Sequence, residues 1–246
     1  MAKKAFDRND LIDNPAARIP VCLCLDVSGS MEDVISDGSS RYREFGGCRI
    51  KMDFLKDGIR RLYDDLKANP NTRYAVDISI VTFADDGDII ADFSGVLGQP
   101  GVFRLETGGM TNMGAGVNLA LNLLTARKNE YKWAGRDYYQ PWLFLFTDGD
   151  ANVNIDELHE AQRRVNDSIK SDKLIFIPVG FGSKESFCRN NELNHFSDTV
   201  KAVRYDSIDY RRFFKWIGES LDSVSRSRPT DIFTPGELPK GYQDMD

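Results

Sequence analysis

The chain has 246 residues, of which 41% are hydrophobic and 28% are charged, and its formal net charge is −6. These values are typical of an ordinary globular protein with one large α/β domain, or less readily two small ones, and the negative charge argues against a nucleic-acid partner. No apolar stretch approaches the ~20 residues that a membrane helix needs, and the N-terminus lacks the apolar core of a signal peptide, so we expect a cytoplasmic protein with no membrane partner.

The first predicted element is a buried parallel strand over residues 19–26, preceded by a polar N-terminal tail over residues 1–18. The strand contains the unbroken apolar run Val21-Cys22-Leu23-Cys24-Leu25, which is typical of a strand covered on both faces. Cys22 and Cys24 lie two positions apart, so they share one face and are expected to be small core residues. The four cysteines of the chain form no C-x-x-C pair, and a reducing compartment fits them best.

This strand ends on Asp26-Val27-Ser28-Gly29-Ser30, the most informative segment of the sequence. The segment carries one carboxylate and two hydroxyls at alternate positions, with a glycine that allows a tight turn between them. Ligands of open α/β sheets gather at the carboxyl ends of the strands, so the segment marks a candidate site. Its oxygen-only side chains suit a hard divalent cation such as Mg²⁺.

The next predicted elements are a long loop, a helix and a β-hairpin. Residues 32–49 are rich in Gly, Ser and charge, and they predict the loop. Apolar residues at helical spacing predict a helix over residues 50–68. Alternating apolar residues over 76–80, an Asp-Asp-Gly turn and a short apolar segment near 89–93 predict the hairpin.

Strand and helix patterns then alternate to the end of the chain. They predict helices over residues 113–124, 155–169 and 208–224, and strands over residues 142–147, 173–179 and 199–205. This order predicts an α/β fold, a three-layer, doubly wound and mostly parallel sheet with one antiparallel edge strand, in a domain over residues 19–225. Residues 226–246 contain three prolines and no periodicity, and they predict a C-terminal tail.

Two further loops at the predicted carboxyl edge carry oxygen ligands. The glycine-rich segment 108–114 presents Thr111 just before a helix, and the strand over 142–147 is followed by Asp148-Gly149. A metal site is therefore predicted on three loops, with oxygens from Asp26, Ser28, Ser30, Thr111 and Asp148. Each residue also has an ordinary alternative: the serines as turn or helix-cap residues, Thr111 as an N-cap, and Asp148 as half of a turn pair. Their joint placement at strand ends favours metal ligation.

Other constellations in the sequence have less support. Asp148-x-Asp150-x-Asn152 begins like a calcium loop, but Val153 stands where the turn glycine belongs and His159 where the bidentate Glu belongs. His159 and His195 are the only histidines, and we expect a helix-face residue and a loop residue rather than a ligand pair. Zinc binding and Ser-His-Asp catalysis therefore have little support.

The D-x-S-x-S, T and D pattern, in this order, resembles the von Willebrand factor type A (VWA) domain and its metal-ion-dependent adhesion site, over residues 19–224. The G-G-x-T spacing around Thr111 agrees with adhesion-type VWA domains, while many bacterial relatives have Gly directly before Thr. The resemblance implies that the five residues named above hold Mg²⁺, with Mn²⁺ or Ca²⁺ as alternatives. It also implies an exchangeable metal position that an Asp or Glu carboxylate of another protein fills, so that the site docks a partner and is not catalytic.

The compact layout and the segment Phe213-Phe214-Lys215-Trp216-Ile217 are similar to bacterial TerY-type proteins of the tellurite-resistance group. That resemblance implies a cytoplasmic, non-enzymatic module of a stress-response or phage-defence system, acting with a Ser/Thr kinase and a protein phosphatase. A metal-dependent phosphohydrolase that uses Asp26 as its nucleophile is the alternative from another class. Ser28 occupies the place where such chemistry usually has a second acid, which favours the docking function.

The loop over 32–49 leaves the same strand as the metal motif, so it is expected to border the docking face. Its Arg41, Tyr42, Arg43 and Phe45 provide the charge and aromatic surface that interfaces favour. A solvated insertion without a binding role is an equal alternative.

Overall fold

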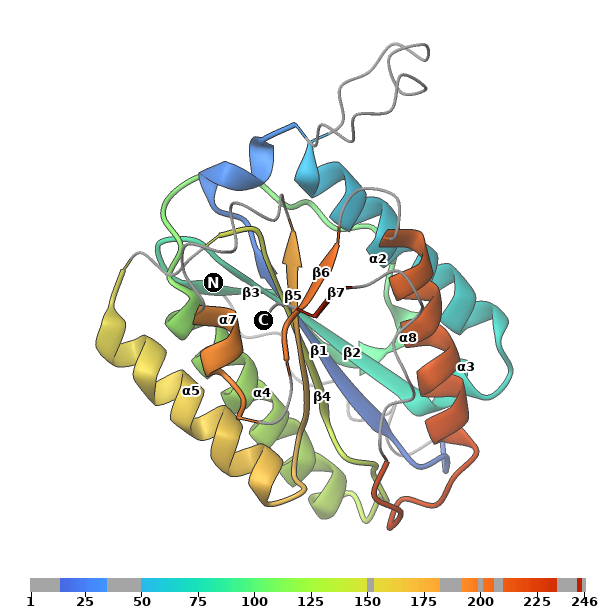
Figure 1. Ribbon diagram of the computed structural model, residues 1–246. Coiled ribbons are helices and arrows are strands. Elements are labelled where there is room, and N and C mark those ends of the chain that lie inside the picture. Colours follow the sequence, from blue (N-terminus) through green and yellow to red (C-terminus); the bar gives the residue numbers. More distant parts are fainter. Residues whose placement is uncertain are drawn as a thin grey trace, which may run out of the picture.

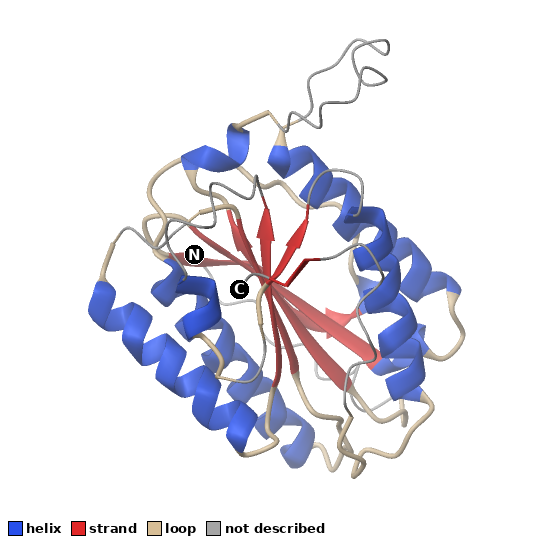
Figure 2. Ribbon diagram, in the orientation of Figure 1, coloured by secondary structure: helices blue, strands red, loops and turns tan. Residues whose placement is uncertain are grey.

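The computed structural model describes residues 14–34, 50–149, 153–181, 192–198, 201–205, 210–233 and 243–244. Its centre is a seven-stranded sheet with the strand order β3-β2-β1-β4-β5-β6-β7 (Figure 2). The strands are β1 (Ile19–Asp26), β2 (Val76–Phe83), β3 (Gly87–Gly95), β4 (Trp142–Thr147), β5 (Ile175–Phe181), β6 (Val203–Tyr205) and β7 (Gln243–Asp244). The five central strands are parallel, while β3 and β7 pair antiparallel at the two edges. The predicted fold class is confirmed, and the structure adds a second antiparallel edge strand, β7, to the one that was predicted.

Helices cover both faces of this sheet (Figure 1). The helices longer than two turns are α2 (Lys51–Ala68), α4 (Met113–Trp133), α5 (Ile155–Lys170) and α8 (Tyr210–Ser225). The short ones are η1 (Gly29–Glu32), α3 (Thr72–Ala75), η3 (Val96–Gly98) and α7 (Glu192–His195). In Figure 1, α2 and α8 lie together on one face, and α4, α5 and α7 lie on the other. No helix of the described residues is long and apolar enough to cross a membrane.

The alternation of side chains along β1 divides the core into two layers. Val21 and Leu23 are buried in the cluster that contains the apolar residues of α2 and α8. Cys22 and Cys24 point the other way, into the cluster formed with α4 and α5. Both cysteines are fully buried, as predicted, and burial raises the pKa of each thiol. Phe213 and Phe214 of α8 are core residues too, and the ring of Phe214 is stacked 5.6 Å from that of Phe146.

Both segments predicted as tails contain residues that contact the folded domain. Arg18 lies within the expected N-terminal tail, yet it is buried, and its Nη1 lies 3.1 Å from Oδ1 of the buried Asp77. The same carboxylate accepts from Arg127 Nη2 at 2.7 Å and from the Tyr131 hydroxyl at 2.6 Å. At the other end of the chain, the Phe233 ring lies 5.6 Å from that of Trp142, and β7 extends the sheet beyond β6. Neither contact has a periodic sequence signal, because each depends on one or two residues.

Candidate metal centre

Two of the predicted ligands lie at the carboxyl ends of adjacent parallel strands. Asp26 is the last residue of β1, and Asp148 follows the last residue of β4. The two strands pair in register up to Leu25 and Phe146, so both carboxylates lie at the same edge of the sheet. In Figure 1 this is the edge at which η1 and the beginning of α2 lie.

A continuous chain of hydrogen bonds joins the two carboxylates through the two serines. The backbone N–H of Ser28 donates to Asp26 Oδ1 at 2.7 Å, and the Oγ atoms of Ser28 and Ser30 lie 3.2 Å apart. Ser30 Oγ in turn donates to Asp148 Oδ1 at 2.7 Å. Ser28 precedes η1, but its side chain makes no capping hydrogen bond there, so the helix-cap alternative does not account for it. The structure therefore brings four of the five predicted residues into one cluster.

The fifth residue, Thr111, lies on the neighbouring loop. The backbone N–H of Gly29 donates to the carbonyl of Gly109 at 3.2 Å, which places the two loops side by side. Thr111 is buried, with 4% of its surface exposed. It is not the N-cap of α4, because Asn112 has that role and accepts from the backbone N–H of Ala115 at 3.1 Å. The N-cap alternative for Thr111 is therefore wrong.

Asp26 is held at both carboxylate oxygens inside the protein. It is fully buried, and Thr147 Oγ1 donates to its Oδ2 at 2.5 Å. The pKa of Asp26 is raised to about 6, mainly by burial and also by the charge of Asp148, against the lowering effect of the hydrogen bonds from Ser28 and Thr147. Thr147 was not predicted as a site residue. Thr147 is the last residue of β4, and the pairing of β4 with β1 places it beside Asp26. The sequence alone does not show which strands pair.

A lysine that the sequence did not single out also reaches this site. Lys51 Nζ lies 2.6 Å from Asp148 Oδ2, 3.1 Å from the backbone carbonyl oxygen of Ser30 and 3.1 Å from Asp33 Oδ2. Burial alone would lower the pKa of Lys51, but the hydrogen bonds and charges of Asp148 and Asp33 outweigh it and raise the pKa above its ordinary value. Lys51 is therefore a charged ammonium group at neutral pH.

The donor atoms of this cluster fit a hard divalent cation. They are carboxylate and hydroxyl oxygens, which Mg²⁺ prefers. The negative charges of Asp26 and Asp148 repel each other, and a cation between them would relieve this repulsion. Asp148 already binds a cationic group, the ammonium of Lys51. Within the part of the chain that the structure describes, no group of three or more His, Cys, Asp or Glu side chains is arranged to hold a metal, so a thiolate- or imidazole-rich zinc site has no support there.

The remaining candidates lie apart from the cluster or outside the described residues. His159 is exposed on α5, as expected of a helix-face residue. His195 ends α7, rather than lying in a loop, and its Nδ1 is 3.6 Å from Glu192 Oε2. The aromatic and basic residues at 41–45 lie outside the described residues. The calcium-like motif at 148–152 lies partly outside them.

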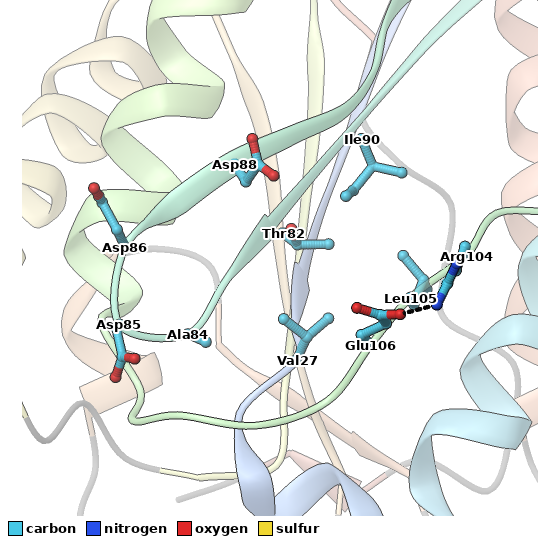
Figure 3. Close-up of a pocket in the computed structure, with 10 residues that line it drawn as sticks. All are labelled: Val27, Thr82, Ala84, Asp85, Asp86, Asp88, Ile90, Arg104, Leu105 and Glu106. Atoms are coloured by element: carbon cyan, nitrogen blue, oxygen red, sulfur yellow. Dashed lines mark ion pairs between the residues drawn. The ribbon is translucent and has the colours of Figure 1, made fainter. Parts of the chain in front are cut away.

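An acidic pocket of about 520 Å³ borders the cluster at Val27 (Figure 3). It lies between the β2–β3 hairpin and the segment that leads to Thr111, and its charged lining residues are Asp85, Asp86, Asp88, Arg104 and Glu106. Each of the three Asp carboxylates accepts a backbone N–H of the hairpin or the glycine loop, at 2.7–2.9 Å. Arg104 pairs with Glu106 at 2.5 Å. These backbone hydrogen bonds and this ion pair are sufficient reason for the acidic residues of the pocket, so the pocket gives no ground for proposing a bound ligand.

No protein-family model matches the chain, and no curated protein matches it either. Among solved structures, the chain is similar to the PilB minor pilin of Streptococcus sanguinis, with a TM-score of 0.56 and 14% identity over 85% of this chain. The chain spans 62% of that pilin's length.

Two structures described as von Willebrand domains are also similar. The von Willebrand factor type A protein of Catenulispora acidiphila has a TM-score of 0.53 and 18% identity, over 84% of this chain and 43% of that one. The vWF domain of the type V pili tip protein Mfa5 of Porphyromonas gingivalis has a TM-score of 0.59 and 10% identity, over 89% of this chain and 99% of that one. At these identities the likeness concerns the fold, and the fold of this chain is that of a von Willebrand factor type A domain.

Proposed function

We propose that this protein is a divalent-cation-dependent protein-interaction module, with Mg²⁺ held by Asp26, Ser28, Ser30, Thr111 and Asp148. Mn²⁺ and Ca²⁺ are the alternative ions. The observation that carries the proposal is the hydrogen-bonded chain from Asp26 through the two serines to Asp148, at the edge of the sheet where ligands of this fold class bind. The VWA fold of the chain supports the same function.

The side chains of the cluster suit docking more than turnover. Asp26 and Asp148 supply the negative charge, and Ser28 and Ser30 supply neutral hydroxyls. A bound cation with few anionic ligands would offer an electron-poor position that an Asp or Glu carboxylate of a partner protein can fill. Ser30 is exposed while Asp26 is buried, so a partner would approach from the Ser30 side of the cluster.

The proposed partner system follows from the resemblance to TerY-type proteins. On that basis the chain acts in a bacterial stress-response or phage-defence system, in the cytoplasm, together with a Ser/Thr kinase and a protein phosphatase. Two of the similar structures are a pilin and a pilus tip protein, which lends support to an interaction function without selecting a system.

The phosphohydrolase alternative receives no support from the geometry of Asp26. An attacking carboxylate needs an oxygen that can approach a phosphorus atom. Asp26 is fully buried, so a phosphoester cannot reach its carboxylate. A small cation needs only the second lone pair of an oxygen that already accepts one hydrogen bond, from Ser28 N or Thr147 Oγ1. Phosphate release from p-nitrophenyl phosphate, abolished by Asp26→Asn, would nevertheless establish that activity.

Metal-dependent capture of a partner tests the proposed function. Purified wild-type protein, Asp26→Ala and the control Asp86→Ala would each be incubated with a lysate of the source cells, with Mg²⁺ or with EDTA. Asp86 is an exposed carboxylate at the hairpin turn, so its removal changes the net charge equally. We expect the same proteins, identified by mass spectrometry, to bind wild type and Asp86→Ala with Mg²⁺ only, and not to bind Asp26→Ala. Partner binding that persists in EDTA would contradict the proposal.

A further inference from the structure

The ammonium group of Lys51 is surrounded by oxygens of the candidate metal centre. It contacts the carboxylate of Asp148 at 2.6 Å and the backbone carbonyl oxygen of Ser30 at 3.1 Å. The Lys51 side chain is 13% exposed and that of Asp148 is 1% exposed, so this pair is shielded from water. Asp33, the third contact, is 68% exposed and contributes less. The main interaction of Lys51 is therefore with a carboxylate proposed as a metal ligand.

The backbone holds Lys51 at this place. Its N–H donates to the carbonyl of Asp33 at 3.1 Å, and Val34 and Ile50 pair as an antiparallel bridge. The start of α2 is thereby fixed against the segment that carries Ser30. Lys51 needs no rearrangement of the backbone to reach Asp148.

A lysine at this position of a helix is unfavourable by itself. Lys51 is the first residue of α2, where the partial positive charge of the helix N-terminus disfavours a cation. Helix stability therefore does not account for the residue. The ion pairs with the carboxylates of Asp148 and Asp33 account for it instead. Lys51 therefore interacts with the acidic cluster and does not stabilise its own helix.

Building on the proposed function, we infer that Lys51 is a built-in cationic competitor that weakens Mg²⁺ binding at this site. Asp148 has two carboxylate oxygens, of which Oδ1 accepts from Ser30 and Oδ2 from Lys51. A divalent ion that uses Asp148 must share its charge with the ammonium group or displace it, and the two cations repel each other at short range. The ion pair thus lowers the affinity of the site for the metal.

A second role for Lys51, orienting Asp148 for the metal, predicts the opposite change in Mg²⁺ affinity. If Lys51 only orients Asp148 for the metal, removal of the ammonium group would free the carboxylate to turn away and would weaken Mg²⁺ binding. If Lys51 competes with the metal, removal of its charge would strengthen binding. The sign of the change in affinity separates the two roles.

Isothermal titration with MgCl2 tests the inference on four full-length proteins: wild type, Lys51→Met, Lys51→Arg and the control Lys56→Met. Methionine keeps the length of the side chain and removes its charge, while arginine keeps the charge. Lys56 is exposed on the same helix, so its replacement matches the loss of net charge. We expect about tenfold tighter binding by Lys51→Met, and binding within about twofold of wild type by Lys51→Arg and Lys56→Met.

Thermal unfolding of the same proteins gives a second measurement. In EDTA, Lys51→Met should melt below wild type, because the buried Asp148 loses its counter-charge. Saturating Mg²⁺ should then raise the melting temperature of Lys51→Met by more than that of wild type. Equal or weaker Mg²⁺ binding by Lys51→Met, with binding by wild type intact, would overturn the inference and leave the proposed function standing. Absence of Mg²⁺ binding by both proteins would overturn both.

Discussion

Thr147 Oγ1 donates to Asp26 Oδ2 at 2.5 Å and thereby joins the ends of β1 and β4, two strands whose terminal residues are 121 positions apart in the sequence. Because Ser28 N donates to the other oxygen, the Asp26 carboxylate is fixed in direction before any ligand arrives. A carboxylate fixed in this way loses little further freedom when it binds a cation. The geometry of the candidate centre therefore depends on the pairing of β1 with β4 as well as on the loops that follow the strands.

Replacement of Thr147 by Val should destabilise the protein and weaken Mg²⁺ binding. Valine keeps the shape of threonine but leaves a buried carboxylate oxygen without its donor, which costs about 1–3 kcal/mol. Urea unfolding in EDTA at pH 7.5 measures the loss of stability. Thr82→Val is the control, since Thr82 is a buried strand residue that lies on β2. An equal loss in the two variants would contradict the special role of Thr147.

The stability of the protein should depend on pH through Asp26. Burial raises its pKa from an ordinary value of 3.8 to about 6 in the folded protein, so the folded state binds more protons than the unfolded state between these values. The contribution of Asp26 to the free energy of unfolding is therefore fully present below about pH 3.8. It falls as the pH rises through 6, by about 3 kcal/mol in total.

Urea unfolding of wild type and Asp26→Asn in EDTA, at intervals from pH 4 to pH 7, isolates this contribution. The difference in stability between the two proteins should shift in favour of Asp26→Asn as the pH rises, because Asn carries no charge that must be buried. Added Mg²⁺ should reduce the shift for wild type, since it favours the ionised carboxylate. A difference that stays constant over this range would show that the pKa of Asp26 is ordinary.

The sequence predicts the strands and the edge of the sheet well, because long apolar runs and alternating side chains determine both. Asp26 and Asp148 were found in this way, each as a polar residue directly after a buried run. Lys51 was missed because it lies 97 residues from Asp148 in the sequence and begins a helix, where nothing in the periodicity of α2 distinguishes it. Only the packing of the start of that helix against the segment that carries Ser30 brings Lys51 to the carboxylate.

The buried ion cluster around Asp77 should contribute strongly to stability at a distance from the candidate metal centre. Asp77 is the second residue of the buried strand β2 and binds Arg18, Arg127 and Tyr131. Asp77→Ala leaves two buried guanidinium groups without their shared carboxylate, which should cost about 3–5 kcal/mol. Chemical denaturation would measure this cost, with Asp167→Ala as the control. Asp167 pairs with Arg163 at the exposed surface, and its removal should cost less than about 0.5 kcal/mol.

Gly114 should tolerate no side chain, because α4 approaches the beginning of α5 closely at this point. A Cβ atom there would lie 2.5 Å from the backbone nitrogen of Leu158 and 2.6 Å from the carbonyl carbon of Glu157. Gly114→Ala should therefore destabilise the protein by about 2–3 kcal/mol, measured by urea unfolding. Gly98→Ala is the matched control, since nothing lies within 4 Å of the added atom, and it should change stability by less than about 0.5 kcal/mol.

Anomalous diffraction from crystals soaked in MnCl2 would show directly whether the oxygens of Asp26, Ser28, Ser30, Thr111 and Asp148 hold a divalent cation. Manganese takes the same oxygen ligands as magnesium and gives an anomalous signal that identifies its position. We expect one strong anomalous peak among the side-chain oxygens of Asp26, Ser28 and Ser30, and no such peak in crystals of Asp26→Ala. A peak elsewhere, or a wild-type crystal without a peak at this edge of the sheet, would contradict the proposed metal site.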